Sequence, residues 1–346
     1  MKPSASAPPP ADASSVFDTL TAYWKTSALK AGLDLDLFSR IGSGLGTASE
    51  LAKAAGASPR GVAIIADALC GLGFLVKKSG RYSLTPVADG FLRSESPAFL
   101  GGFHKFLTSD YIWTAFSRVT EAARAGRSQI GTNALTPENP AWQVFAESST
   151  AMARAEGPTL ADLAGAKRPG LRILDVAAGS GEYGIAVARE SHGSELTYLD
   201  WPNVLPVALR HAEAAGIRPA PKTIPGDALK VNWGGPYDVI VASHFLHHFN
   251  PEDCRRICSK ARAALAPEGR FIVQEFVADE AREAKEEGAA GGPFPLLFAV
   301  AMLVTTDEGD AYTLGQLREF LTAGGLRMDP ARHSQAGPST WISARV

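Results

Sequence analysis

A glycine loop between an apolar run and an amphipathic run restricts the fold of this 346-residue sequence more than any other feature. Residues 171–176 (LRILDV) are typical of a buried strand, and residues 182–191 (EYGIAVARES) have helical periodicity. Gly179, Gly181 and Gly184 lie between and within them in the pattern GxGxxG. A strand that passes through glycines into a helix is typical of α/β units that bind nucleotide-like ligands at the helix N-terminus. The pattern alone does not identify the ligand.

Further strands and helices alternate after this unit. The apolar runs at residues 196–201, 236–245 and 269–277 predict strands, and residues 251–265 predict a helix between the last two. Such alternation predicts a Rossmann-like, doubly wound parallel sheet, whose ligands bind at the carboxyl ends of the strands. The C-terminal part of the chain is therefore expected to carry the chemistry, with final strands near the C-terminus.

The N-terminal part has a different, mainly helical pattern. Thr47 followed by Glu50 is a capping-box signature, and Pro59 opens a second predicted helix. Residues 74–84 (FLVKKSGRYSL) predict two short strands around a turn. Helix, helix and hairpin form the winged-helix pattern, but the second helix presents nothing basic to a DNA groove. We expect its apolar surface to pack against a second subunit instead.

Length and composition bound the remaining possibilities. A chain of this length is expected to form more than one domain. The 34 basic and 36 acidic residues, with a net charge of -2, offer no footprint for nucleic acid or an anionic membrane. Three cysteines are no disulfide framework, and the N-terminus lacks an apolar signal region, so we expect a cytoplasmic protein. The apolar run at residues 294–304 is too short for a bilayer and predicts a buried helix.

These patterns divide the chain into four expected segments. Residues 1–14 are expected to be a disordered tail, and residues 15–98 a winged-helix dimerisation domain. Residues 99–165 carry scattered aromatic side chains and are expected to form a helical linker that contributes to a substrate pocket. Residues 166–346 are expected to be the catalytic domain.

Acidic residues follow three predicted strands of the catalytic part. Asp175 would repel a pyrophosphate but would suit a ligand with an ammonium group and a sulfonium, such as S-adenosylmethionine. Asp200, 19 positions after Gly181, lies where a carboxylate can accept both ribose hydroxyls. Asp227 is placed to bind the adenine amino group. Each residue alone could equally be a helix cap or a turn residue, but together they favour an adenosyl ligand.

Three histidines, His244, His247 and His248, follow the strand predicted at residues 236–245. They could bind a metal, although no recognised ligand spacing accompanies them, or pack structurally, or supply a general base. A base of this type suits an acidic aryl or enolic hydroxyl, because an aliphatic alcohol is far less acidic. Glu275, 28 residues after His247, ends the next strand and could hold the histidine tautomer, or could simply cap a turn.

In its motifs the sequence resembles the two-domain S-adenosylmethionine-dependent O-methyltransferases of small-molecule secondary metabolism, which include plant phenylpropanoid and flavonoid enzymes and bacterial natural-product enzymes. The resemblance runs from about residue 19 to the C-terminus. Its motifs are, in order, ELAKAAGASPR, GRYSLTPVADGFL, LDVAAGSG, LDWPNVL, PGDAL, FLHHFNPEDC, APEGRFIVQE and YTLGQLREFLTAGGL. Each motif is ordinary, but their joint order and spacing are specific.

The resemblance implies a role for each site residue. His247 of LHHF corresponds to the family's base, and Glu275 to the carboxylate that supports it. Met302 falls where the family contacts the acceptor, and we place His244 with it. The predicted cofactor residues are Asp175, Gly179, Gly181, Asp200, Asp227 and Ser243. The family also implies a homodimer formed through the N-terminal domain, a small-molecule acceptor and no metal.

This chain departs from the family pattern at several positions. The family has a second glutamate that supports the base. In this chain residues 309–313 read GDAYT, and Ala311 occupies the position of that glutamate. Either Asp310 or Glu308 takes over that role, or the base is less strongly supported. The other departures are Ala177 and Ala178 at common glycine positions and His248 and Phe249 in place of Asp and Trp.

The sequence therefore predicts a homodimeric, metal-independent methyltransferase that acts on a hydroxyl of an aromatic or polyketide-like small molecule. A C- or N-methyltransferase on the same scaffold is one alternative. An NAD-dependent oxidoreductase, on the strength of GxGxxG, and a ligand-sensing winged-helix regulator are alternatives from other classes.

Overall fold

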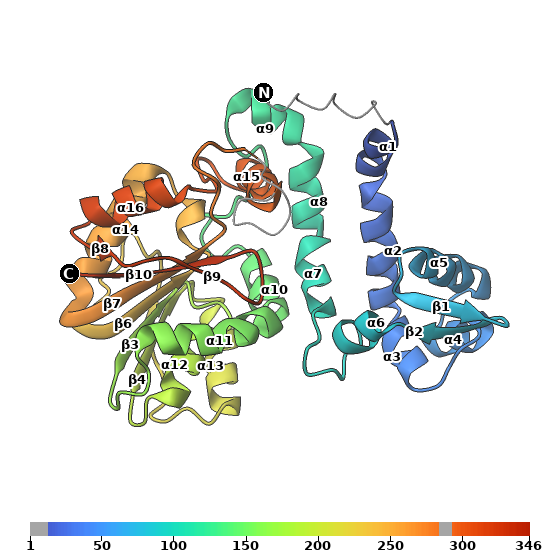
Figure 1. The fold of residues 1–346 in the computed structure, drawn as a ribbon, viewed down its shortest axis with the longest axis horizontal. Helices are drawn as coiled ribbons and strands as arrows, with labels where there is room; N and C mark the ends of the chain where they lie inside the picture. The colour runs from blue at the N-terminus through green and yellow to red at the C-terminus, as the bar shows by residue number, and fades with distance from the viewer. Residues whose placement is uncertain (1–12, 284–292) are drawn as a thin grey trace, which may run out of the picture. The chain divides into compact units, whose positions relative to one another are not determined.

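The computed structural model describes residues 13–283 and 293–346, which divide into two compact units between His104 and Lys105 (Figure 1). Residues 1–12 of the predicted tail lie outside the described residues. The first helix begins at Ser14, the last residue of that predicted tail. Within the described ranges, no helix has both the length and the apolar character needed to span a membrane.

The N-terminal unit has the predicted order of helices followed by a hairpin. Its helices are α1 (Ser14–Leu20), α2 (Ala22–Asp34), α3 (Leu37–Gly42), α4 (Ala48–Ala55), α5 (Pro59–Gly71) and α6 (Pro86–Phe91), with a 3-10 turn η1 (Gly101–Phe103). The strands β1 (Leu75–Lys78) and β2 (Arg81–Leu84) pair antiparallel. The capping box of α4 is confirmed: Glu50 N–H donates to the Thr47 hydroxyl, and Thr47 N–H donates to the Glu50 carboxylate.

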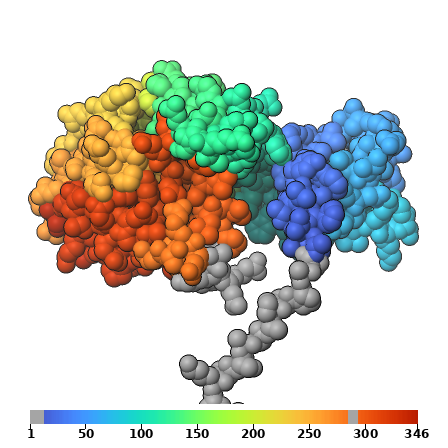
Figure 2. All heavy atoms as spheres, turned by 90° about the horizontal axis from the view of Figure 1, so that it is seen from above, coloured from blue at the N-terminus to red at the C-terminus, as the bar shows by residue number. Residues whose placement is uncertain are grey.

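The second unit begins with five helices that precede the sheet. They are α7 (His104–Leu107), which starts at the boundary, α8 (Asp110–Ser117), α9 (Val119–Ala125), α10 (Ala141–Ser148) and α11 (Thr150–Ala164). Helices α8 and α9 pack on the C-terminal helix α15 (Pro293–Thr305), and α10 packs on α13 (Leu205–Ala214). In the space-filling view the green segment that contains these early helices lies against the yellow and orange parts of the same unit (Figure 2).

The central sheet is mixed rather than purely parallel. Its strands are β3 (Arg172–Val176), β4 (Glu195–Asp200), β5 (Lys222–Pro225), β6 (Tyr237–Ser243), β7 (Leu265–Glu275), β8 (Arg327–Met328), β9 (Arg332–His333) and β10 (Thr340–Arg345). The order is β5-β4-β3-β6-β7-β10-β8, with β9 also paired to β10. Strands β3 to β7 are parallel, but β10 pairs antiparallel with β7, β8 and β9. The predicted all-parallel sheet is corrected here, because β10 returns from β9 through a short turn without a crossover helix.

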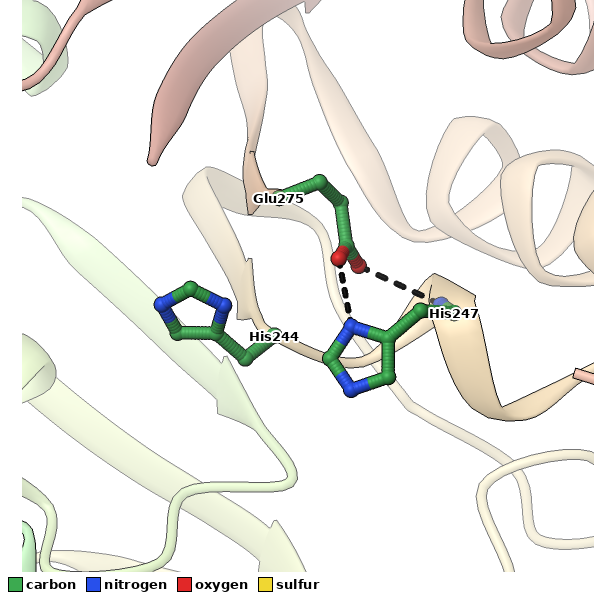
Figure 3. A group of neighbouring side chains, drawn as sticks. All are labelled: His244, His247 and Glu275. Atoms are coloured by element: carbon green, nitrogen blue, oxygen red, sulfur yellow. Dashed lines mark hydrogen bonds and ion pairs between the residues drawn. The ribbon is translucent and has the colours of Figure 1, made fainter. Parts of the chain in front are cut away.

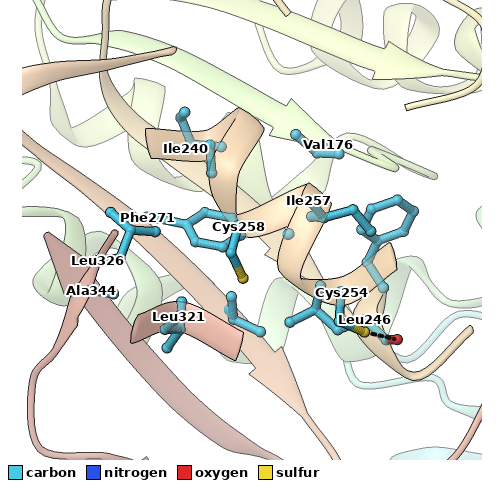
Figure 4. Close-up of a cluster of buried hydrophobic side chains, with 14 of the residues drawn as sticks. Val176, Ile240, Leu246, Cys254, Ile257, Cys258, Phe271, Leu321, Leu326 and Ala344 are labelled. Carbon is cyan, nitrogen blue, oxygen red and sulfur yellow. Dashed lines mark hydrogen bonds between the residues drawn. The ribbon is translucent and has the colours of Figure 1, made fainter. Parts of the chain in front are cut away.

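Helices cover both faces of this sheet, which explains its nearly continuous apolar strands. Successive residues of β3 face opposite ways: Ile173 packs with α11, α12 (Glu182–Glu190) and α13, whereas Leu174 packs with α14 (Pro251–Ala264) and α16 (Leu314–Ala323). Cys254 and Cys258 of α14 are buried in the cluster that contains Leu174 (Figure 4).

The apolar run at residues 294–304 forms α15, which is only partly buried. Met302 and Val304 are buried, but Phe294 and Leu297 are exposed. The expectation of a buried helix therefore fails at these two residues of its first half. That half follows residues outside the described ranges and lies beside the carboxyl ends of the strands, where the site described below is built.

Candidate active site

The glycine loop connects β3 to α12 through three residues in the left-handed region. Ala177, Gly179 and Gly181 have φ values of 54°, 55° and 75°. A Cβ on Gly181 would lie 2.8 Å from Tyr198 atoms and 2.9 Å from Ala208, so packing as well as conformation requires glycine there. A Cβ on Gly179 would meet nothing closer than 4.0 Å. The loop therefore leaves open space beside Gly179, and Ala177 carries backbone strain that glycine would avoid.

Asp175 was predicted to contact a cationic cofactor, but its side chain is enclosed by the protein. Its side chain is 1% exposed, and one carboxylate oxygen accepts the Gly184 N–H at 2.8 Å. Burial raises the pKa of Asp175 to about 8. A largely neutral, enclosed carboxyl does not attract a cation strongly. Asp175 instead ties β3 to the first turn of α12 and so shapes the glycine loop.

Asp200 is the last residue of β4 and Asp227 follows β5, at the edge where the glycine loop begins. Asp200 accepts the Gly179 N–H at 2.8 Å on one oxygen and the Trp201 N–H at 2.7 Å on the other. Burial raises the pKa of Asp200 to about 6, although both hydrogen bonds oppose the shift. Asp227 accepts the Leu229 N–H and pairs with Lys230 at 3.2 Å. Both carboxylates keep lone pairs for a further donor.

Ser243 and His244 end β6. The Ser243 hydroxyl donates to the Gln274 side chain at 2.8 Å, and the His244 N–H donates to the Gln274 carbonyl at 2.8 Å. His244 has a φ of 50°, and its ring contacts Phe276 with centroids 4.4 Å apart and planes tilted by 32°. Burial lowers the pKa of His244 to about 4. Gln274 was not predicted, because its role comes from the pairing of β6 with β7 rather than from any local motif.

His247 and Glu275 form a buried pair, as the strand order predicts. The Nδ1 atom of His247 lies 2.5 Å from one Glu275 carboxylate oxygen (Figure 3). The other oxygen accepts the backbone N–H groups of Phe245 at 3.0 Å and Leu246 at 2.7 Å, and that of His247 at 3.4 Å. The two side chains are buried. One carboxylate thus holds both the ring and the turn η2 (Leu246–His248) that carries it.

Burial sets the protonation of this pair. It lowers the pKa of His247 to about 3, so the ring is neutral at pH 7. Burial also raises the pKa of Glu275, but the backbone N–H groups stabilise its ionised form. A neutral ring that donates from Nδ1 to the carboxylate has its lone pair on Nε2. The geometry therefore prepares Nε2 to accept a proton.

Aromatic side chains surround His247. The Phe298 ring of α15 meets the His247 ring edge to face at 4.8 Å, and Phe276 contacts Phe298 at 4.7 Å. Met302, predicted as an acceptor contact, is buried one helical turn after Phe298. Sequence reasoning missed Phe298 and Phe276, although the apolar composition of α15 was a signal for the first.

Neither candidate replacement for the second glutamate binds the His247 ring. Asp310 forms an ion pair with Arg282 at 2.8 Å, and the Glu308 carboxylate accepts from the Asn250 side chain at 2.8 Å. Ala311 is fully buried. Among the described residues, Glu275 is thus the one carboxylate bound to the His247 ring.

His244, His247 and Glu275 bring potential metal-ligand atoms within 4.8 Å of one another. Two ligands of one tetrahedral zinc are separated by roughly 3 Å or more, given bonds of about 2.0–2.2 Å. The 2.5 Å contact between His247 and Glu275 is instead the distance of a strong hydrogen bond. As arranged, His247 and Glu275 are joined by a hydrogen bond, and His244 takes no part in it.

Comparisons with known proteins find matches along most of this chain. Residues 17–94 match a family model described as an O-methyltransferase dimerisation domain, and residues 174–271 match one described as a methyltransferase domain. The crystal structure of a protein described as an O-methyltransferase from Nostoc punctiforme PCC 73102 is 31% identical, with a TM-score of 0.88, and the match covers 96% of this chain and 99% of that one.

Two relatives with assigned activities align over most of both chains. The 3-hydroxy-5-methyl-1-naphthoate 3-O-methyltransferase of Streptomyces sahachiroi is 27% identical over 317 residues, 89% of this chain and 88% of the relative. The acetylserotonin O-methyltransferase of Mus musculus is 28% identical over 365 residues, 99% of this chain and 91% of the relative.

Proposed function

Since this chain belongs to the two-domain S-adenosylmethionine-dependent O-methyltransferases, we propose that it methylates a hydroxyl of an aromatic or polyketide-like small molecule, with His247 as the general base. The observation that carries the proposal is the 2.5 Å contact between His247 Nδ1 and Glu275. It fixes the tautomer that leaves Nε2 free to accept the hydroxyl proton.

The residues at the carboxyl ends of β3 to β6 fit the cofactor. Asp200 has a lone pair left on each oxygen for the two ribose hydroxyls, and the space beside Gly179 allows a ligand to approach the backbone. Gly181, Asp227 and Ser243 complete the proposed cofactor site, and Asp175 acts on it through Gly184. When bound, S-adenosylmethionine supplies an electrophilic methyl group.

Proton removal accompanies methyl transfer in this proposal. A buried imidazole is too weak a base to ionise a phenol beforehand, since the phenol has an ordinary pKa of about 10. As the oxygen attacks, its hydroxyl proton moves to His247 Nε2. Glu275 then stabilises the imidazolium through Nδ1. Positioning by the surrounding residues contributes most of the rate, and the base adds about 10² to 10⁴-fold.

The surroundings of His247 support an aromatic acceptor. Phe276, Phe298 and Met302 offer apolar and ring surfaces close to the base. The two relatives with assigned activities act on a hydroxynaphthoate and on acetylserotonin. Helices from residues 105–165 pack within the same unit, which supports their proposed contribution to the acceptor pocket.

We also propose that the enzyme is a homodimer formed through its N-terminal unit, a winged helix that serves dimerisation instead of DNA binding. The match of residues 17–94 to a dimerisation domain supports this proposal. So does a row of exposed apolar side chains on α1 and α2, comprising Phe17, Leu20, Tyr23 and Trp24. The three free cysteines are consistent with a cytoplasmic enzyme.

Calorimetry and product analysis test the proposal. S-adenosylhomocysteine should bind the full-length protein, whereas NADH should not. Incubation with S-adenosylmethionine and a panel of aryl and enolic hydroxyl compounds should give a methyl ether, identified by NMR. NADH binding of comparable strength, or a product methylated on carbon or nitrogen, would contradict the proposal.

A further inference from the structure

We infer that His248 contacts the acceptor, donating a hydrogen bond from Nε2 to a second oxygen that lies next to the hydroxyl methylated at His247. The inference rests on the proposed function of His247. It narrows the acceptor class to aryl or enolic hydroxyls with a vicinal carbonyl or ether oxygen.

The ring of His248 is held beside that of His247. The two ring centroids are 4.3 Å apart, with an angle of 62° between the planes. The His248 ring also meets Trp142 edge to face, with centroids 5.3 Å apart. Trp142 is itself fixed, because its indole N–H donates to the Ala134 carbonyl at 2.9 Å and its ring packs on Phe145. The orientation of His248 is therefore set before an acceptor binds.

The surroundings of His248 also select its tautomer. The Nδ1 atom is buried and has no hydrogen-bond partner within residues 13–283 and 293–346, although the residue as a whole is partly exposed. Burial keeps the pKa of His248 well below its usual value, so the ring carries a single N–H. An unpaired buried N–H is rarer than an unpaired acceptor. The proton therefore belongs on Nε2, at the exposed edge of the ring.

The two neighbouring rings thus offer opposite hydrogen-bonding groups. His247 donates from Nδ1 to Glu275 and presents a lone pair on Nε2, whereas His248 presents an N–H. A hydroxyl that donates to the first, next to an oxygen that accepts from the second, complements both. A carboxylate at position 248, as in the family pattern, could only accept, and would suit a second hydroxyl instead.

Paired acceptor isomers and paired variants test this inference. The probes are 3-methoxynaphthalen-2-ol, whose ether oxygen is next to the hydroxyl, and 6-methoxynaphthalen-2-ol, whose ether oxygen is remote. The readout is kcat/KM for each isomer with the full-length enzyme. We expect the vicinal isomer to be preferred by about tenfold, the contribution of one hydrogen bond. His248→Gln, whose amide nitrogen reaches the position of Nε2, should keep most of the preference.

His248→Asn provides the matched control, since its amide nitrogen reaches only the position of Nδ1. It should lose the preference, as should His248→Phe, while both variants retain affinity for S-adenosylhomocysteine. Equal use of the two isomers by the wild-type enzyme, or an unchanged preference in His248→Asn, would overturn the inference but leave the proposed function intact. Binding of S-adenosylhomocysteine without methylation of either naphthol would overturn both the inference and the proposed acceptor class.

Discussion

Glu275 binds His247 twice, at 2.5 Å through the ring Nδ1 and at 3.4 Å through the backbone N–H. The first contact sets the tautomer, and the second helps to fix the turn in which the ring lies. Because Phe245 and Leu246 donate to the same carboxylate oxygen, the ring has little freedom to leave its position. The pair therefore has the rigidity that a positioned base requires.

Replacement of His247 tests the base directly. His247→Gln removes the group that accepts the hydroxyl proton but leaves the cofactor residues unchanged. We expect kcat to fall at least tenfold, toward the 10²-fold typical of a lost general base, with an unchanged dissociation constant for S-adenosylhomocysteine. Single-turnover kinetics and calorimetry provide the two measurements. Unchanged turnover would remove the assignment of His247 as base.

Glu275→Gln should lower kcat nearly as much as replacement of His247 does. The glutamine carbonyl can still accept the N–H groups of Phe245 and Leu246, so the turn should survive. Its amide N–H₂ would face His247 Nδ1, however, and would favour the tautomer with the proton on Nε2. We expect kcat to fall about 10²-fold while the melting temperature changes little. A large loss of stability with normal specific activity in the folded fraction would assign Glu275 a structural role only.

Glu308→Gln and Asp310→Asn should leave turnover within about threefold of wild type. Their carboxylates bind Asn250 and Arg282 rather than the base, so neither supplies the missing second glutamate. The Asp310 pair is partly exposed, and its loss should lower the free energy of unfolding by less than about 1 kcal/mol. A tenfold decrease in kcat for either variant would show that the carboxylate reaches the base during the reaction.

The sequence predicted that Glu275 could hold the His247 ring, with the capping of a turn as the alternative. Neighbouring parallel strands bring their carboxyl ends to one edge, and the pairing of β6 with β7 brings His247 and Glu275 together although 28 residues separate them. The capping box of α4 was equally predictable, since all its hydrogen bonds are local.

Features that depend on long-range packing were not predictable in this way. Strand β10 pairs antiparallel with β7, and this pairing depends on contacts between strands that are far apart in the sequence. Local periodicity does not show which strands will pair. The charge of Asp175 suggested a cationic ligand, but only the packing of α12 shows that the carboxyl is enclosed. Phe298 of α15 reaches His247 although 51 residues separate the two in the chain.

Ala177→Gly should stabilise the protein, although it removes a methyl group. Ala177 has a φ of 54°, a conformation that is unfavourable for an L-residue by roughly 1–2 kcal/mol. Glycine relieves that strain but has a more flexible unfolded state, which reduces the net gain to about 1 kcal/mol. Ala178→Gly is the control, because Ala178 is buried and does not have a positive φ. This substitution should destabilise the folded protein. Chemical denaturation should show a higher free energy of unfolding than wild type for Ala177→Gly and a lower one for Ala178→Gly.

Asp175→Asn should change how stability depends on pH. Since burial raises the folded pKa of Asp175 to about 8, above the ordinary value of about 3.9, the folded state holds a proton that the unfolded state loses between these values. Wild-type stability contributed by this group therefore falls as the pH rises toward 8. Asparagine can still accept the Gly184 N–H but does not titrate. Between pH 6 and pH 8 the free energy of unfolding of Asp175→Asn should rise relative to wild type by about 2 kcal/mol. A difference that stays constant over this range would mean that Asp175 is already ionised and could attract a cationic ligand after all.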